Sequence, residues 1–282
     1  MRVPIRTIDT PSRTGQNGIV EMRLGDAAPI NVMLDTGSVG LRLWSVPSGA
    51  APLGKAIMTF GGVATTIAVP FQRIDTDSSY IQQWKAIGVA GILGVGVGRG
   101  ALTNPLASLP GNLGKRWSIH FARNTSTSGA GALLLGAKTP TDALMYFPLP
   151  RLHKNANGVT LWDDHAATGC WTFDRLPEQC VPTWFDSGFT VMRIKGSQFA
   201  SLPQTAANLL KPGTRVGMAA GSSAFAPSHF VAGHAGSRNL ARVLPKGKPT
   251  INTGNSFFFD YKVTYDITTG ALYLGQLPEK GN

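Results

Sequence analysis

The chain has 282 residues, with 34 glycines, 19 prolines and 26 lysines and arginines against 15 aspartates and glutamates, so its net charge is +11. This length can bury a sizeable core as one large domain or two smaller ones, and short apolar runs between glycines and prolines predict an all-β protein with a few short helices. The most apolar stretch, "IGVAGILGVGVG", is shorter and richer in glycine than the ~20 apolar residues of a transmembrane helix, so we expect no transmembrane segment.

The first part of the chain predicts two pairs of strands. Residues 17–37, "NGIVEMRLGDAAPINVMLDTG", alternate apolar and polar side chains and predict two strands that are joined at Gly25–Pro29 and end at Asp35. Residues 55–71, "KAIMTFGGVATTIAVPF", predict a hairpin whose turn is Gly61–Gly62, because glycine tolerates the positive φ angles of tight hairpin turns.

The rest of the chain continues this pattern. Residues 88–96, "GVAGILGVG", predict a buried strand that leads to a small helix before the next proline. We expect the best helical stretches near residues 100–109 and 197–211. Residues 257–275, "FFFDYKVTYDITTGALYLG", predict two or three strands around a turn at Thr268–Gly270.

Two stretches align on an aspartate. They are "MLDTGSVGLRL" at 33–43 and "WFDSGFTVMRI" at 184–194, in which Asp35 and Asp186 are 151 positions apart. Alone, each Asp-Ser/Thr-Gly is ordinary turn chemistry, because Asp and Ser bond their own backbone and Gly supplies positive φ. However, each copy has an apolar pair before the aspartate and an apolar-Arg-apolar triplet after the turn, which favours a duplicated structural unit.

Other landmarks recur in the same order. "GALLLGA" at 131–137 matches "GALYLGQ" at 270–276, and "GILGVGV" matches "TINTGNS" with Gly94 and Gly254 aligned. An internal duplication of this kind predicts two homologous β lobes related by a pseudo-two-fold axis. We predict an N-terminal lobe of residues 1–148 and a C-terminal lobe of residues 149–282.

Two aspartate turns that met across such an axis would bring two carboxyl groups close together. Like charges at that distance cannot both ionise, so Asp35 and Asp186 would share one proton. The ionised carboxylate could then activate water as general base, while the protonated partner polarises a carbonyl as general acid. This pattern predicts hydrolysis without a cofactor or metal.

The two cysteines, Cys170 and Cys180, bracket nine residues that include Pro177. Such a gap suits a disulfide across a loop or hairpin, and a reduced buried pair is the alternative. We favour the disulfide and with it an oxidising compartment, which predicts a secreted or periplasmic protein. The start, "MRVPIRTIDT", lacks the apolar core of a signal peptide, so we expect either a cytosolic protein or a mature fragment with an added methionine.

The stretches "VMLDTGSVGLRLW", "GILGVG", "GALLLG" and "WFDSGFT" resemble, in order and over nearly the whole chain, the landmarks of pepsin-like aspartic proteases. "GCWTFDRLPEQCVPTWFDSG" also resembles the small disulfide loop before that family's second aspartate. The resemblance implies a bilobal, mostly β fold, a cleft between the lobes, a catalytic dyad of Asp35 and Asp186, and a mobile flap. It predicts a monomer that acts on peptide or protein substrates, and the compact length without a propeptide resembles bacterial members.

Carried over to this sequence, the resemblance gives roles to the turn residues. Thr36 and Ser187 would be the hydroxyls that lock the two turns together. Gly37 and Gly188 would let a peptide backbone approach, because a side chain there would collide with it. Ser38 would hydrogen-bond the first aspartate.

The family's flap would be the hairpin "TFGGV", with Phe60, Gly61 and Gly62 against the substrate. Phe60 departs from the tyrosine that is usual there, so no hydroxyl can anchor this flap, and we expect it to be mobile. Arg42 stands where a tryptophan often supports that tyrosine, with Trp44 close by.

Phe189 is a further departure, because the second motif usually has Ser or Thr at that position. We expect Asp186 to lose a hydrogen bond there, with Thr190 as a compensating donor. The loss predicts a raised pKa for Asp186 and a less acidic pH optimum.

Two other classes of function compete with the protease. One is a non-catalytic pepsin-like fold used for binding, as in inhibitor-like proteins, but both aspartates and both turn glycines are present. The other is a basic scaffold that contacts an anionic cell-surface polymer. The cations are scattered, and the densest group is only Arg238, Arg242, Lys246 and Lys248. No recognition helix or aromatic-basic signature accompanies them, so we do not expect nucleic-acid binding.

Overall fold

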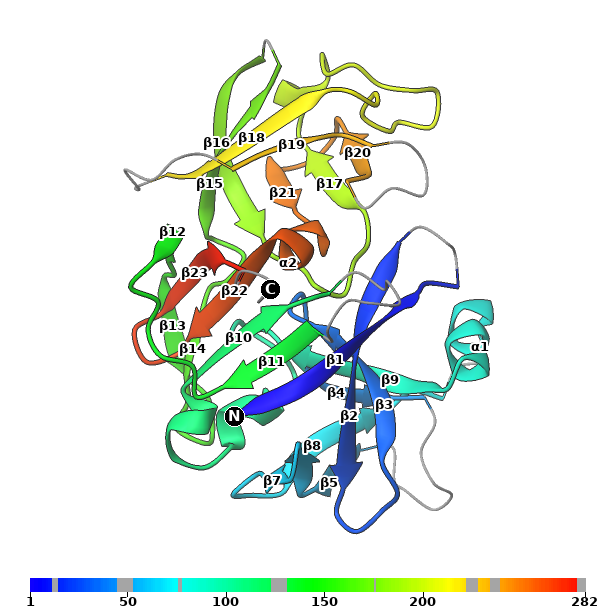
Figure 1. Cartoon of the computed structure of the whole chain (residues 1–282), viewed down its shortest axis with the longest axis vertical. Helices are drawn as coiled ribbons and strands as arrows, with labels where there is room; N and C mark the ends of the chain where they lie inside the picture. Colours follow the sequence, from blue (N-terminus) through cyan, green and yellow to red (C-terminus); the bar gives the residue numbers. More distant parts are fainter. Residues whose placement is uncertain are drawn as a thin grey trace, which may run out of the picture.

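The chain forms two β lobes on either side of a shared central sheet (Figure 1). The computed structural model describes residues 1–11, 15–44, 53–75, 78–122, 131–174, 176–221, 228–233 and 239–277. In Figure 1 the N-terminal lobe lies at the bottom and the lobe with β15 to β21 at the top. Arg238 of the basic group lies outside the described residues.

One sheet runs from the central layer into the N-terminal lobe, in the order β12-β23-β22-β10-β11-β1-β2-β3-β9-β4-β8-β5, with β6 attached to β2 and β7 attached to β6. Its strands are β1 (Arg2–Asp9), β2 (Gln16–Leu24), β3 (Ile30–Asp35), β4 (Val39–Leu43), β5 (Leu53–Ala56), β6 (Met58–Phe60), β7 (Val63–Ala64), β8 (Val69–Arg73), β9 (Val89–Val95), β10 (Arg116–His120), β11 (Gly131–Leu135), β12 (Ala143–Pro148), β22 (Tyr261–Asp266) and β23 (Ala271–Gln276).

The C-terminal lobe has a second sheet, in the order β19-β18-β15-β16-β21-β17-β20, and a hairpin of β13 and β14 lies beside the central layer. These strands are β13 (Arg151–Lys154), β14 (Thr160–Trp162), β15 (Thr168–Phe173), β16 (Leu176–Trp184), β17 (Met192–Lys195), β18 (Arg215–Ala220), β19 (Ser228–Val231), β20 (Ala241–Leu244) and β21 (Thr250–Asn252).

The strand pairing around the two aspartate turns is the same in both lobes. In each lobe the strand before the aspartate pairs in parallel, β3 with β9 and β16 with β21. The strand after the aspartate pairs antiparallel with the same neighbour, which sets Arg42 opposite Ile92 and Arg193 opposite Asn252. The duplication predicted from the sequence is therefore present in the hydrogen-bond register.

The central layer joins the two copies. Antiparallel β10 and β22 lie at its middle, where the hydroxyls of Ser118 and Thr264 are 2.7 Å apart. The repeated Gly-Ala-Leu segments form the flanking strands β11 and β23. Because β12 pairs with β23, the C-terminal copy recruits residues from Ala143 onward. The division at residue 148 stays a prediction.

Alternation in the sequence explains how these strands pack. In β1, for example, Val3 and Ile5 face inward and are at most 2% exposed, while their neighbours are exposed. One large apolar cluster extends through both lobes and includes Trp117 and Trp171. Apolar side chains thus cover the inner faces of both sheets, which holds the aspartate turns on a rigid base.

The helices are short and differ from the sequence expectation. They are α1 (Ser79–Ala86), η1 (Pro105–Ser108), η2 (Gly111–Gly114), η3 (Ser197–Phe199) and α2 (Ser256–Asp260). The helix expected before Pro105 begins at Pro105 instead, since proline lacks an N–H and fits best in a first turn. The expected helix over 197–211 is limited to η3, and Pro203 would break its continuation. None of the helices described has the length and apolar composition to cross a bilayer.

Candidate active site

Each aspartate is held by its own turn. Gly37 N–H donates to Asp35 Oδ1 at 2.8 Å, and Gly188 N–H donates to Asp186 Oδ1 at 3.0 Å. Both turns follow the end of a strand with buried neighbours, β3 in one lobe and β16 in the other. The local sequence Asp-Ser/Thr-Gly therefore fixes the direction of each carboxyl group.

The two turns are also bonded to each other. Thr36 N–H donates to Ser187 Oγ at 3.0 Å, and Ser187 N–H donates to Thr36 Oγ1 at 2.9 Å. Each hydroxyl then donates across to the opposite lobe, Thr36 to the carbonyl of Phe185 at 2.5 Å and Ser187 to that of Leu34 at 2.9 Å. Both hydroxyls are buried, so these reciprocal hydrogen bonds determine the spacing of the lobes at the site.

The carboxyl groups meet because the turn residues are glycine. A Cβ atom on Gly37 would lie 2.5 Å from Cγ of Asp186, and a Cβ on Gly188 would lie 2.4 Å from Oδ1 of Asp35. Each aspartate therefore packs against the backbone of the other turn. Burial and the charge of the neighbouring Asp186 carboxyl raise the pKa of Asp35.

The outer oxygens of the two aspartates have different donors. Ser38 Oγ donates to Asp35 Oδ2 at 2.6 Å, whereas Asn252 Nδ2 donates to Asp186 Oδ2 at 2.7 Å. The orientation of the Asn252 amide follows from its other atom, because Oδ1 accepts the N–H of Gly254 at 2.8 Å. An amide NH₂ can only donate, so it favours an ionised Asp186, while a hydroxyl suits either protonation state of Asp35.

The expected loss of a hydrogen bond at Asp186 is therefore wrong. Phe189 does remove the local hydroxyl, but Asn252 on β21 supplies a donor from another strand. The sequence signal for Asn252 is "TINTGNS", whose alignment with the first copy places Asn252 opposite Ile92. An amide where the first copy has an apolar residue marks a position with a new role.

The pKa of Asp35 is raised to about 7. Desolvation by burial is the largest cause and the adjacent Asp186 carboxyl is the second, while hydrogen bonds from Ser38 and Gly37 act in the opposite direction. Asp35 keeps partial contact with solvent, so a proton can reach it. Below about pH 7 the pair therefore carries a proton on Asp35.

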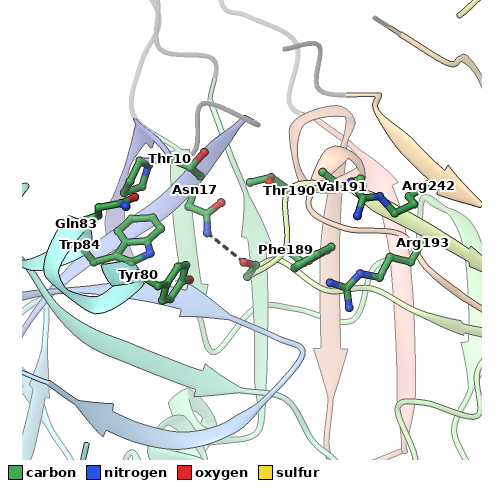
Figure 2. A pocket seen from close by; sticks show the side chains of 12 residues that line it. Thr10, Asn17, Tyr80, Gln83, Trp84, Phe189, Thr190, Val191, Arg193 and Arg242 are labelled. Carbon is green, nitrogen blue, oxygen red and sulfur yellow. Dashed lines mark hydrogen bonds between the residues drawn. The ribbon is translucent and has the colours of Figure 1, made fainter. Parts of the chain in front are cut away.

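A pocket of about 280 Å³ lies beside the dyad, between the lobes. Figure 2 shows its two walls, with Tyr80, Gln83 and Trp84 of α1 on one side and Arg193 and Arg242 on the other. Gly188 belongs to its lining, and the carbonyl of Gly188 accepts from Asn17 Nδ2 at 3.1 Å. The remaining described lining residues are Thr10, Pro11, Phe189, Thr190 and Val191.

Comparison with known proteins adds a whole-chain likeness. No protein-family model matches the sequence, and no curated protein matches it. Among solved structures, the chain is similar to the crystal structure of an aspartic proteinase from Irpex lacteus, with a TM-score of 0.63 and 16% identity. The match covers 98% of this chain and 97% of that one. The fold is that of a pepsin-like aspartic proteinase.

In this pepsin-like fold the hairpin of β6 and β7 does not cover the dyad. The predicted turn at Gly61–Gly62 is present, but Phe60 is completely buried in the core. A Cβ on Gly61 would contact Val3, near the end of β1 that lies away from the pocket. The expectation of a flap built from Phe60, Gly61 and Gly62 is therefore wrong.

Helix α1 takes that place beside the pocket of the pepsin-like fold. It is supported by a small cluster in which its Ile81 and Trp84 pack against Trp44. Tyr80 is 52% exposed and points toward the pocket (Figure 2). Arg42, in contrast, donates to the carbonyl of Val39 and does not line the pocket. The sequence signal for α1 is Ser78 followed by apolar residues at helical spacing, which is too short to stand out.

The disulfide prediction is confirmed. Cys170 and Cys180 are bonded to each other and join paired positions on β15 and β16. The bond closes the hairpin whose second strand leads to Asp186. The small disulfide loop expected from the resemblance is thus present, and its disulfide links two paired strands.

Proposed function

We propose that this protein is an aspartic endopeptidase, which binds a peptide or protein substrate between its lobes and hydrolyses a peptide bond with Asp35 and Asp186. The observation that carries the proposal is the contact of each carboxyl with the opposite turn glycine. Two carboxyls so arranged share one proton, and that is the state that acid–base hydrolysis by a water molecule requires.

The hydrogen bonds assign the two roles. Asp186 faces two obligate donors, Gly188 N–H and Asn252 Nδ2, and acts as the ionised base. It takes a proton from water as the water oxygen bonds to the substrate carbonyl carbon. Asp35, whose pKa is raised by burial, gives its proton to the carbonyl oxygen. When the C–N bond breaks, the amine nitrogen takes a proton from Asp186 and the carbonyl re-forms by returning a proton to Asp35.

A pepsin-like fold used only for binding is the second candidate. Such a protein would have no use for an Asp35 whose pKa is raised by burial and by the adjacent Asp186 carboxyl, and burying that group costs stability. The hydrogen-bond set around the dyad therefore favours the enzyme. The disulfide favours a secreted or periplasmic location. A monomeric state and contact with an anionic polymer stay predictions.

The test is cleavage of a peptide library between pH 3 and pH 8 by the natural protein, Asp35→Asn and Asp186→Asn. Each variant should lose cleavage while keeping its circular dichroism, and the double variant should lose little more, because the pair acts as a unit. Activity of the natural protein should fall as pH rises through about 7, where Asp35 loses its proton. The exposed Asp26→Asn is the matched control.

Near-normal turnover by either single variant would overturn the dyad mechanism. Absence of cleavage by the natural protein, together with tight peptide binding, would support the binding fold instead. The two results are distinct because binding is measured without turnover.

A further inference from the structure

The wall of the pocket in the C-terminal lobe is positively charged. Arg193 on β17 and Arg242 on β20 are directly paired positions of two parallel strands, and both line the pocket. None of the described residues that line it is acidic. The pocket that lies beside Gly188 of the second turn therefore holds two positive charges.

No carboxylate among the described residues neutralises these arginines. The ion pairs recorded there involve Arg73, Arg116, His165 and Arg215 instead. Like charges on paired strand positions repel each other, so this pair does not benefit the fold. Its presence in a pocket calls for an anionic ligand.

The arginine nearer to the dyad is held in position. The guanidinium of Arg193 lies 3.9 Å from the ring centroid of Phe189, the residue that follows the dyad glycine. Such a stack orients the planar group and leaves its N–H donors free to point into the pocket. This contact explains the departure at Phe189, because the usual Ser or Thr has no aromatic ring on which the guanidinium of Arg193 could stack.

The opposite wall is neutral and partly polar. Tyr80 and Gln83 offer a hydroxyl and an amide, and Trp84 offers an apolar face (Figure 2). A side chain that reaches this pocket would meet hydrogen-bond donors on one side and guanidinium groups on the other. That combination matches a carboxylate on a short apolar stem.

We propose that this pocket selects an acidic side chain of the substrate, Glu or Asp, through Arg193 and Arg242. The inference rests on the proposed peptidase function and names its substrate class. An exposed guanidinium gains modestly from one carboxylate, but two of them in a bidentate or forked arrangement gain more. We expect a preference of about tenfold for Glu over Gln, equivalent to about 1.4 kcal/mol.

The protonation of the dyad agrees with this choice. A glutamate side chain with a pKa of about 4.3 is mostly ionised above about pH 5. Asp35, with its pKa of about 7, keeps its proton there. Catalysis and recognition of a charged substrate can therefore occur in one pH window.

The experiment compares peptides that differ only by Glu, Gln or Lys at each position around an apolar cleavage site. At pH 6 the natural enzyme should cleave one Glu peptide with kcat/KM about tenfold above its Gln partner. The double variant Arg193→Gln, Arg242→Gln should lose this preference, and Arg151→Gln, an exposed arginine outside the pocket, should keep it. A double variant with Glu at both positions should favour the Lys peptide instead.

A second arm separates this inference from the proposed function. The same Glu and Gln peptides are bound to the Asp35→Asn protein, with and without the two Gln substitutions, and followed by fluorescence polarisation. Tighter binding of the Glu peptide that depends on the arginines supports the inference even without turnover. Equal affinity for the Glu and Gln peptides overturns the inference. A preference for the Glu peptide that persists in the double variant overturns it as well. If the variants weaken binding of heparin and not of the Glu peptide, the arginines serve an anionic polymer, and the inference is wrong.

Discussion

The two aspartates are bonded alike by their own turns and differently by their neighbours. Gly37 and Gly188 each donate one backbone N–H, but Ser38 bonds Asp35 while Asn252 bonds Asp186. Because only the amide is an obligate donor, this single difference breaks the symmetry of a duplicated site. It directs the shared proton to Asp35.

Replacing Asn252 by Ala should disturb that assignment. The ionised Asp186 would lose a hydrogen bond to a charged group, which is worth about 1.5–3 kcal/mol. We therefore expect kcat/KM to fall at least tenfold. Steady-state peptide cleavage at pH 6 measures this loss, with the exposed Asn112→Ala as control. A kcat/KM equal to that of the control variant would show that Asn252 does not act on the dyad.

Asp35 should also make stability depend on pH. Its pKa is about 7 in the folded protein against 3.8 for an ordinary aspartate, so the folded state binds the proton more tightly than the unfolded state. The stability this gives is fully present below about pH 4 and is lost as pH rises through about 7. Asp35→Asn cannot ionise, so at pH 8 it should exceed the natural protein in stability by about 2 kcal/mol.

Chemical denaturation at pH 4 and pH 8 measures this difference. The gain at pH 8 should largely disappear at pH 4, where Asp35 is protonated in the folded state and partly protonated in the unfolded state. A gain of equal size at both pH values would contradict the titration of Asp35 and indicate a packing effect. Asp26→Asn, at an exposed position, should show no such trend.

At the scale of elements, α1 is a helix that the sequence patterns did not predict. The helix has 8 residues and begins after Ser78, whose side chain accepts the N–H of Ile81 at 3.3 Å. Two buried side chains, Ile81 and Trp84, hold it on the lobe. A short helix with few anchors depends strongly on its cap, because isolated helices of this length are unstable in water.

Ser78→Ala should loosen α1 without unfolding the protein. Loss of an N-cap costs about 1 kcal/mol, so amide exchange in α1 should speed up about fivefold. We expect KM for peptides to rise, since Tyr80 and Gln83 form a wall of the pocket, and kcat to change less. Hydrogen exchange read by mass spectrometry, together with steady-state kinetics, checks this. Ser197→Ala in η3 is the control, and equal kinetics in both variants would remove α1 from substrate binding.

At the scale of the whole molecule, the lobes are joined at two levels. The central sheet pairs β10 of one copy with β22 of the other, and the site itself is joined by Thr36 and Ser187. Both connections lie near the axis that relates the copies. The dyad is therefore part of the structure that holds the lobes together.

Thr36→Val should affect both stability and catalysis. The change removes the buried hydroxyl that accepts from Ser187 N–H and donates to the carbonyl of Phe185. The N–H of Ser187 would lose its partner, while the carbonyl of Phe185 would keep the hydroxyl of Tyr265, so the cost should be about 1–3 kcal/mol. Denaturant unfolding and peptide cleavage measure the two effects. Thr66→Val, which removes one hydroxyl bond at an exposed site, should cost far less, and an equal cost would contradict the role of the cross-lobe bonds.

Much of the fold and of the dyad could be predicted from the sequence because these features are local and repeated. Alternating strands that end in Asp-Ser/Thr-Gly predicted the aspartates, their turn glycines and the bilobal β architecture. The duplication predicted that the turns meet, since two copies of one unit pack most simply about a two-fold axis. The spacing of Cys170 and Cys180 favoured a bond that the pairing of β15 with β16 makes.

The parts that the tertiary structure decided are contacts between segments distant in sequence. Asn252 lies 66 positions from Asp186, and α1 lies beside the pocket, at the place that the sequence pattern predicted for the hairpin of β6 and β7. The glycine turn after Phe60 is typical of the tip of a flap. Whether Phe60 is buried in the core depends on the strands that surround it, and the local sequence of the turn does not determine those strands. Arg193 and Arg242 become neighbours only because β17 and β20 pair in register. A local sequence determines turns and strand periodicity, whereas the donor at an oxygen or the charge in a pocket depends on how separate strands come together.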